Sequence, residues 1–505
     1  MPFRATPLAA LLVLLPGASP PPGPDDRLAV ELRRLYGGAV QPWERWRRRS
    51  TVRLPDGREV AREQAYRDDP AFVPAARRLL ASRAGDDAPL GAWLLGTLPE
   101  TRTSAAEPVL AESLFGPDRR AAFEAVGALA AIGTGASLAA LVRAADEAPS
   151  DDVRTAAAWA AGEVRRRSAA GRDEGREIAG SLPSPAGPAL AVGFLRGVSW
   201  WMSEGRTDSG EASFRRLASL GVTWVSIHTW DPLQCGLDDA ALATPDRHFG
   251  FRDLGALVKA AHAAGLRVMV KPHLEMRGRE ATGEHLQHNR IAMRSEADWR
   301  RWFESYGGYV LPYAREAQAA GADMFCVGRE MDTTVIRREA DWRELVSRIR
   351  AEFHGPLTYS ANFDTWPGIR FWDALDFIGV SAYFPLADRP DPSLDDLEVG
   401  WDRALGPLEE ASRRFRRPVL LTEAGFPSIP TAAKAPWREE HVPADVWLQA
   451  RCYEATLRAL ARRPWIEGAF FWLWERTSPP PFRDPSHAIT GKPASFTMAR
   501  WYAAR

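Results

Sequence analysis

The stretch FCVGREM, residues 325–331, is a short apolar run that ends on an arginine and a glutamate. A second stretch, PVLLTEAGF at residues 418–426, carries Glu423 at the end of its own apolar run. Each pattern is typical of a buried strand with a carboxylate at its carboxyl end. Because a buried carboxylate is costly unless a cation pairs with it or it has a chemical task, the two glutamates decide how the rest of the chain is interpreted.

Around these stretches, strand-like runs alternate with amphipathic helical segments about every 30 residues. Several helical segments, such as 211–221 and 254–265, end in glycine, which is a common helix stop. Alternation of this kind predicts a (β/α)8 barrel. A doubly wound open sheet is the alternative, but the segment after the first strand lacks the glycine spacing of a phosphate loop. The predicted strands are 193–201, 221–230, 266–275, 322–330, 356–362, 377–384, 418–424 and 466–474.

Residues 25–167 lack this alternation of strand-like and helical segments and predict an all-α domain rich in Ala, Leu and Arg. Three segments, at 87–96, 118–127 and 152–162, each begin with Asp and reach Gly nine or ten residues later. Asp is a good N-cap and Gly allows neighbouring helices to approach closely. The pattern resembles HEAT-like repeats and indicates a packing or docking module that a protein partner could bind.

Residues 168–190 are rich in Gly, Pro, Ser and charge and are predicted to be a linker, so that the barrel domain occupies residues 191–505. At the other end, residues 1–24 contain Arg4, an apolar run over 8–15 and then small residues, the layout of a secretory signal peptide. We therefore expect a secreted or periplasmic protein. No other segment is long and apolar enough to predict a membrane span.

The composition excludes several classes of function. The formal net charge is zero, which gives no electrostatic case for binding nucleic acid or an anionic membrane. The three cysteines, Cys235, Cys326 and Cys452, are far apart and make neither a disulfide framework nor a metal cluster. We expect no cofactor and no metal ion. Twenty tryptophans are many for this length, and flat aromatic faces are what carbohydrate sites place against sugar rings.

Active sites of (β/α)8 barrels form where the strands end at their carboxyl termini. Glu330 and Glu423 fall on the fourth and seventh strands, and their separation of 93 residues matches three strand–helix units. Carboxylates there can approach across the barrel mouth, and a spacing of about 5–5.5 Å would suit a nucleophile and a general acid/base acting on a sugar acetal. The candidate site residues at or next to the strand ends are Trp200, Trp201, His228, Trp230, Lys271, His273, Arg329, Glu330, Asn362, Tyr383, Glu423, Trp472 and Trp474.

Each candidate also has a structural interpretation. Glu330 by itself could be an ion-pair partner of Arg329, and the tryptophans could plug the barrel. His228 and His273 fit substrate contacts, orienting groups or core histidines equally well. Lys271 close to them disfavours a metal site, because a cation repels a metal ion. The pair of glutamates is what raises catalysis above these alternatives.

The barrel half is similar to the retaining glycosidases of clan A, and resembles most closely glycoside hydrolase family 113, which includes β-1,4-mannanases. The resemblance implies a (β/α)8 fold and a saccharide substrate. It implies Glu330 as acid/base, Glu423 as nucleophile, Tyr383 as a hydrogen-bond donor to the nucleophile, and Trp472 or Trp474 under the sugar that is cleaved. The segments that carry it are 197–201, 217–230, 266–275, 325–331, 420–428 and 491–495.

One residue departs from the pattern: many clan A enzymes have Asn just before the acid/base, where it contacts the sugar 2-hydroxyl, and here that residue is Arg329. The leading hypothesis is a secreted retaining glycosidase acting on β-1,4-mannan. The alternatives are the same chemistry on another β-glycan, or an inactive carbohydrate-binding barrel with a helical docking module.

Overall fold

The computed structural model describes most of the barrel and of the helical region. The predicted signal peptide and nearly all of the predicted linker lie outside the described residues. Among the residues that are described, no helix is both long and apolar enough to cross a membrane. The described residues are 28–30, 32–33, 51–53, 59–61, 70–82, 87–98, 100–168, 188–201, 210–229, 231–243, 254–280, 286–440, 442–474 and 484–503.

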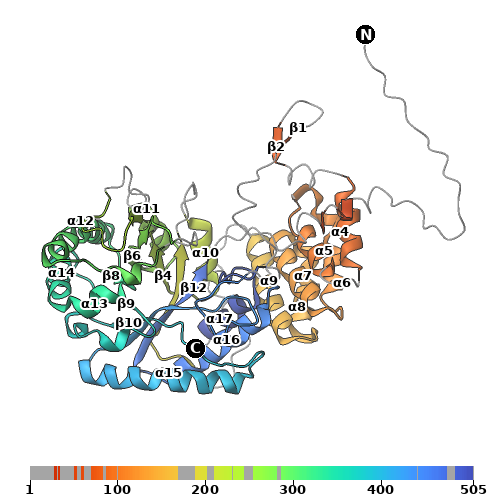
Figure 1. Ribbon diagram of the computed structural model, residues 1–505. Coiled ribbons are helices and arrows are strands. Elements are labelled where there is room, and N and C mark those ends of the chain that lie inside the picture. The colour runs from red at the N-terminus through yellow and green to blue at the C-terminus, as the bar shows by residue number, and fades with distance from the viewer. Residues whose placement is uncertain are drawn as a thin grey trace, which may run out of the picture.

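Eight parallel strands close into a barrel in the C-terminal region, which confirms the predicted fold class (Figure 1). Their order around the barrel is β10-β11-β12-β3-β4-β6-β8-β9. Every predicted strand segment contains one of them. The strands are β3 (Leu195–Trp201), β4 (Trp224–His228), β6 (Arg267–Lys271), β8 (Met324–Arg329), β9 (Leu357–Asn362), β10 (Ile378–Ser381), β11 (Val419–Ala424) and β12 (Ile466–Trp474).

The predicted strand 266–275 is in fact two strands. β6 ends at Lys271, and Pro272, which has no N–H to donate, separates it from β7 (Leu274–Met276). β7 leaves the barrel and pairs in parallel with β5 (Asp231–Gln234) in a small second sheet. This break turns Glu275 away from the barrel ladder and places it beside the mouth.

Helices surround the barrel, and most connections between strands contain at least one. The exception lies between β9 and β10, where the chain forms only the short 3-10 helices η4 (Trp366–Gly368) and η5 (Trp372–Ala374). The helices of this region are α10 (Glu211–Ser219), α11 (Leu254–Ala263), η3 (His288–Arg290), α12 (Glu296–Ala320), α13 (Asp332–Arg337), α14 (Glu339–Glu352), α15 (Leu394–Phe415), α16 (Val446–Ala461) and α17 (Pro493–Ala503).

The inside of the barrel changes from apolar to polar along the strands. A closed cluster of buried apolar side chains fills its amino-terminal part: Leu195, Trp224, Met269, Met324, Cys326, Phe377, Leu420 and Phe470. Above it, the Ser360 hydroxyl group hydrogen-bonds those of Ser381 and Thr422 at 3.0 and 2.7 Å. The next step along the strands reaches the charged residues at the mouth. The apolar cluster thus supports the polar groups from below, as a packed barrel core does.

The helical region precedes the barrel and also contains a two-stranded hairpin, β1 (Thr51–Arg53) and β2 (Glu59–Ala61). Only one of the three predicted Asp caps has that role: the Asp118 carboxylate accepts from the backbone N–H groups of Arg120 and Ala121. Asp87 lies inside its helix and binds Arg33 instead. The helices are α4 (Phe72–Leu80), α5 (Asp87–Leu95), η1 (Glu100–Ala105), α6 (Glu107–Ser113), α7 (Arg119–Ile132), α8 (Gly135–Glu147) and α9 (Asp151–Ser168).

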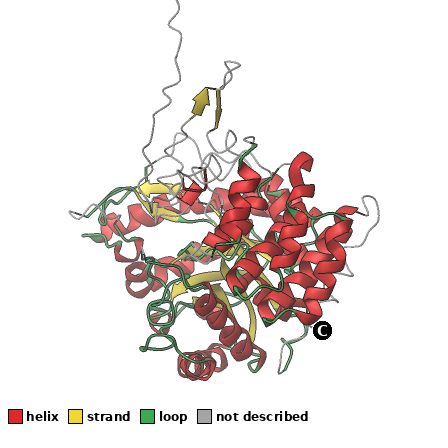
Figure 2. Cartoon of the chain, turned by 90° about the vertical axis from the view of Figure 1, so that its right-hand side faces the viewer, coloured by secondary structure: helices red, strands yellow, loops and turns green. Residues whose placement is uncertain are grey.

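The helical region packs against the barrel through a shared aromatic contact. Phe496 of α17 lies 5.4 Å from Phe123 of α7 and 5.3 Å from Trp159 of α9, measured between ring centroids. The Arg216 guanidinium of α10 lies over the Trp159 ring at 3.5 Å and pairs with Glu163. α9 and α17 lie side by side, as Figure 1 shows. Figure 2 shows the red helices around the yellow strands of the barrel.

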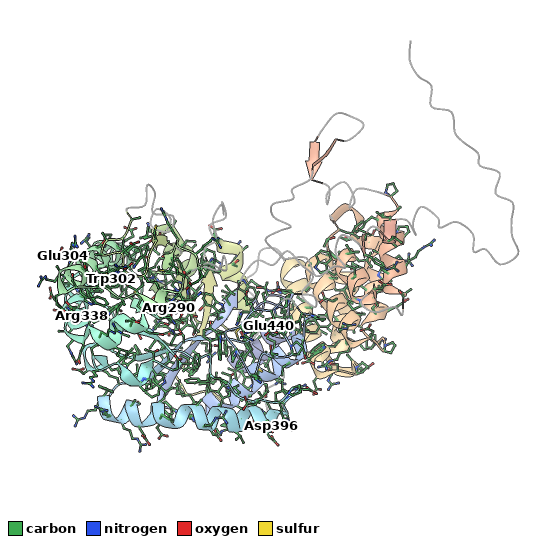
Figure 3. The ribbon with its side chains drawn as sticks, viewed as in Figure 1. Arg290, Trp302, Glu304, Arg338, Asp396 and Glu440 are labelled. Carbon is green, nitrogen blue, oxygen red and sulfur yellow. The ribbon has the colours of Figure 1, made fainter. Side chains whose placement is uncertain are left out.

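This contact leaves the opposite side of the barrel free of the helical region, and Glu304 and Arg338 mark that side in Figure 3. α17 also hydrogen-bonds to two strands of the barrel, β3 and β12. The Tyr502 hydroxyl donates to the backbone oxygen of Gly197 at 3.1 Å, and a second acceptor, the Ala469 oxygen, lies at 3.5 Å. One helix therefore bridges the β3–β12 seam of the barrel and the helical region.

We expect Phe496→Ala to destabilise the whole chain, because it removes a buried ring that both regions share. Truncation of a buried Phe costs about 3–5 kcal/mol of unfolding free energy, measured here by urea denaturation. The control is Val399→Ala on α15, where the side chain is 63% exposed and the expected loss is under about 0.5 kcal/mol. Equal losses in the two variants would contradict a shared core.

Candidate active site

The carboxyl ends of the barrel strands enclose a cavity of about 540 Å³. Glu330, which follows β8, and Glu423 of β11 both line it. The two glutamates of the sequence analysis thus face one space, although β9 and β10 separate their strands in the closed barrel. The complete lining is Gln287, His288, Asn289, Arg329, Glu330, Asn362, Phe363, Asp364, Tyr383, Glu423, Trp437, Glu439, Trp472 and His487.

Glu423 is held by two donors at the floor of the mouth. The Lys271 ammonium donates to Oε1 at 2.5 Å, and the Tyr383 hydroxyl donates to Oε2 at 2.8 Å. The side chains of Lys271 and Glu423 are 0% and 3% exposed. A buried carboxylate needs such partners, and each of its oxygens keeps a further lone pair. Glu423 is therefore a fixed anion with room for one more contact.

Two histidines and two tryptophans lie next to this ion pair. His228 Nδ1 and His273 Nε2 are 2.8 Å apart and share a hydrogen bond. Burial, together with the charges of Lys271 and Arg329, lowers the pKa of both histidines well below its usual value. They are consequently neutral at pH 7. The ring of Trp472 lies 5.1 Å from that of His228 and 5.5 Å from that of Trp201.

Glu330 belongs to a second group of charges. Arg329 donates to Glu330 at 2.9 Å and to Glu275 at 2.6 Å, so one guanidinium bridges two carboxylates. His288 Nε2 lies 3.5 Å from the same Glu330 oxygen. The backbone of Glu330 has a φ of 51°, in the left-handed region that costs a residue with a Cβ of order 1–3 kcal/mol. The end of β8 is thus bent so that its carboxylate meets the cavity.

These neighbours set the ionisation of the carboxyl groups. Burial by itself raises the pKa of Glu330, but the Arg329 guanidinium and the nearby His288 ring outweigh it and bring the pKa below its ordinary value. Burial raises the pKa of nearby Asp332 to about 6, against the hydrogen bonds from Asn362. Glu330 is therefore an anion, whereas Asp332 keeps its proton to a higher pH than an ordinary carboxyl group does.

The described residues contain one group of side chains with the geometry of a metal site: ligand atoms of His228, His273 and Glu423 lie within 4.8 Å of one another. The Lys271 ammonium already binds Glu423, and a divalent cation there would be repelled by it. The donor set consequently fits a hydrogen-bonded cluster better than a metal centre.

The structure brings most of the predicted site residues together. Arg329, Glu330, Asn362, Tyr383, Glu423 and Trp472 line the cavity, and Trp201, His228, Lys271 and His273 form the cluster beside Glu423. Trp200 points to the helix side of β3, where it packs on Phe214 of α10, since neighbouring strand residues face opposite sides. Trp474 is likewise buried in the main core. Trp230 lies outside the described residues.

Sequence reasoning missed Glu275, which pairs with Arg329 beside the cavity. It also missed several residues that line the cavity: His288, Phe363, Trp437, Glu439 and His487. All of them lie beyond the barrel strands, where period-2 alternation gives no guidance. Glu275 alone had a usable signal, because it is the last residue of the predicted strand 266–275.

The barrel region is similar to solved structures of GH113 mannanases. The chain is 32% identical to the GH113 beta-mannanase AaManA from Alicyclobacillus acidocaldarius, solved in complex with ManMIm, over 61% of this chain and 97% of that one, with a TM-score of 0.53. It is 27% identical to a GH113 beta-1,4-mannanase solved as a complex, over 62% of this chain and 99% of that one, with a TM-score of 0.55. No curated protein matches the chain.

The family comparisons cover both regions. A model of HEAT repeats matches residues 77–162, which confirms the predicted repeat character of the helical region. The model of Glycoside Hydrolase Family 113 matches residues 198–488, well over half of the chain and all of the strand ends described above. On the strength of that match and of the mannanase structures covered almost end to end, the chain belongs to Glycoside Hydrolase Family 113.

Proposed function

We propose that this glycoside hydrolase cleaves β-1,4-mannan, or a related β-glycan, with retention at the anomeric carbon. The observation that carries the proposal is the placement of Glu330 and Glu423 around one cavity, with Glu423 fixed as an anion. The similar solved structures are mannanases, which supports the choice of sugar.

In the first step, Glu423 attacks the anomeric carbon and forms a glycosyl-enzyme ester. Lys271 and Tyr383 hold the carboxylate in place, so little is lost in orienting it. Glu330 gives a proton to the leaving oxygen in this step, then takes one from water in the second step, which hydrolyses the ester. Trp472, on the cavity wall, supplies an apolar face for the ring that is cleaved.

We expect the parent protein to release reducing sugar from mannan when tested against mannan, glucomannan, cellulose, xylan and chitin oligomers. The first product, followed by proton NMR, should be the β-anomer, because two displacements restore the configuration. Glu423→Gln and Glu330→Gln should each lower kcat/KM by about 10³-fold or more. Glu467→Gln, at an exposed site on β12, is the matched control and should leave kcat/KM unchanged.

Release of the α-anomer first would contradict the double displacement. Full turnover in either active-site variant would show that the glutamates are wrongly assigned. Activity on a glycan other than mannan would keep both glutamates and change only the sugar.

The second candidate function is a barrel that binds glycans without cleaving them, with the helical region docking a protein partner. One observation favours it: the ion pair with Arg329 keeps Glu330 ionised, whereas a general acid must start with a proton. This function would be supported if the parent protein cleaves none of the glycans and the Glu423→Gln variant still binds a glycan.

Arg329→Asn tests how the ion pair between Arg329 and Glu330 affects catalysis. Without the guanidinium, the pKa of Glu330 rises, so its protonated form persists to higher pH. We expect the basic limb of the kcat/KM profile to move up by about one pH unit or more, with higher activity at neutral pH. Arg343→Asn, which breaks a surface ion pair with Asp373, is the control and should leave the profile in place. An unmoved basic limb in Arg329→Asn would exclude Glu330 as the titrating acid.

We also propose that the protein is exported, on the strength of the apolar run and small residues within 1–24. N-terminal sequencing of the protein purified from its source should find the mature chain starting close to residue 25. A chain that begins at residue 1 would contradict export by this route.

A further inference from the structure

Trp437 is an exposed aromatic residue on the wall of the cavity. It is 49% exposed, while most tryptophans of the described chain are buried. Its ring stacks on that of Phe363, with centroids 5.1 Å apart and planes 19° from parallel. Phe363 in turn packs edge-on against Phe384 at 5.9 Å. One face of the indole is thus supported from behind, and much of the remaining surface is open.

The loop that carries Trp437 is held on both sides of it by one buried histidine. His487 Nε2 donates to the backbone oxygen of Pro436 at 2.7 Å, and Nδ1 lies 3.0 Å from the Glu439 carboxylate. The His487 ring also meets that of Tyr383 edge-on at 6.0 Å, and Tyr383 donates to Glu423. Trp437 is therefore tied to the same floor as the proposed nucleophile, which fixes its place before any ligand arrives.

The cavity contains two separate aromatic surfaces. Trp472 lies on β12, whereas Phe363 follows β9 and Trp437 lies in the loop after β11. Glu330 and Glu423 line the same space as both surfaces. A cavity of about 540 Å³ is in the range that holds a drug-sized ligand, which is larger than a single hexose. The second surface has no task if the substrate is one sugar ring.

We propose that Trp437, stacked on Phe363, is a platform for a second sugar ring of the substrate, next to the ring that is cleaved. This inference rests on the proposed glycosidase function and adds a residue that holds the substrate beyond the ring that is cleaved. The C–H face of a pyranose packs on the flat indole and removes apolar surface of both from water. Because the loop is already held by His487, little conformational freedom is lost on binding.

The test compares a substrate that reaches the platform with one that does not. For mannan these are mannotetraose and β-mannosyl fluoride, whose leaving group carries no ring; for another glycan, the corresponding pair is used. Burial of on the order of 50 Å² of apolar surface corresponds to about a tenfold change in affinity. We therefore expect Trp437→Ala to lower kcat/KM for the tetrasaccharide about tenfold more than for the fluoride.

Trp437→Phe is the matched variant, since it keeps a flat ring on Phe363, and it should restore most of the loss. A binding measurement separates the platform from the chemistry: in the Glu423→Gln protein, adding Trp437→Ala should raise the Kd of the tetrasaccharide about tenfold by calorimetry. Equal losses on the two substrates, or an unchanged Kd, would overturn the platform while leaving the glycosidase function intact. If the parent protein cleaves none of the glycans, the proposed function itself is overturned.

Discussion

The mouth of the barrel is organised around the buried ion pair between Lys271 and Glu423. Two charges taken out of water are expensive, and only close contact and further hydrogen bonds offset that cost. Tyr383 provides one such bond, and the neutral histidines His228 and His273 fill the space beside the ammonium group without adding charge. The apolar cluster lower in the barrel closes the site from water on that side. A carboxylate so confined keeps one orientation.

Glu330 is in the opposite situation, because its environment gives it a choice of partner. Arg329 contacts both Glu330 and Glu275, so the guanidinium can stay bound to Glu275 when a substrate oxygen takes its place on Glu330. The same residue stands where many clan A enzymes have Asn, and its charge changes the protonation that the site must reach. The two glutamates therefore differ in how they are held: Glu423 is fixed by two donors, whereas the partner of Glu330 can exchange.

The sequence predicts the barrel well, because eight apolar runs end on polar residues at regular spacing, and the structure places a strand in each. It also brings Glu330 and Glu423 to one mouth, since parallel strands in a closed barrel all end on the same side. The Lys271–Glu423 bond joins residues 152 apart, and no local pattern specifies it. Trp200 shows the limit at the strand ends, where a one-residue step changes the face of the sheet. Trp474 lies beyond a register shift in β12 that pairs it with Trp200, and no local pattern predicts that shift. Trp437 and His487 lie in loops, whose course depends on tertiary contacts.

The position of α17 has a consequence for how the protein is made. This helix fastens β3 to β12 through Tyr502 and covers Phe123 and Trp159 of the helical region with Phe496. It also follows all of these elements in the chain. The ribosome synthesises α17 after them, so the helical region emerges first with its apolar face uncovered. The seam between β3 and β12 also lacks α17 until then. Synthesis therefore passes through a long stage in which both halves expose surfaces that a chaperone would recognise.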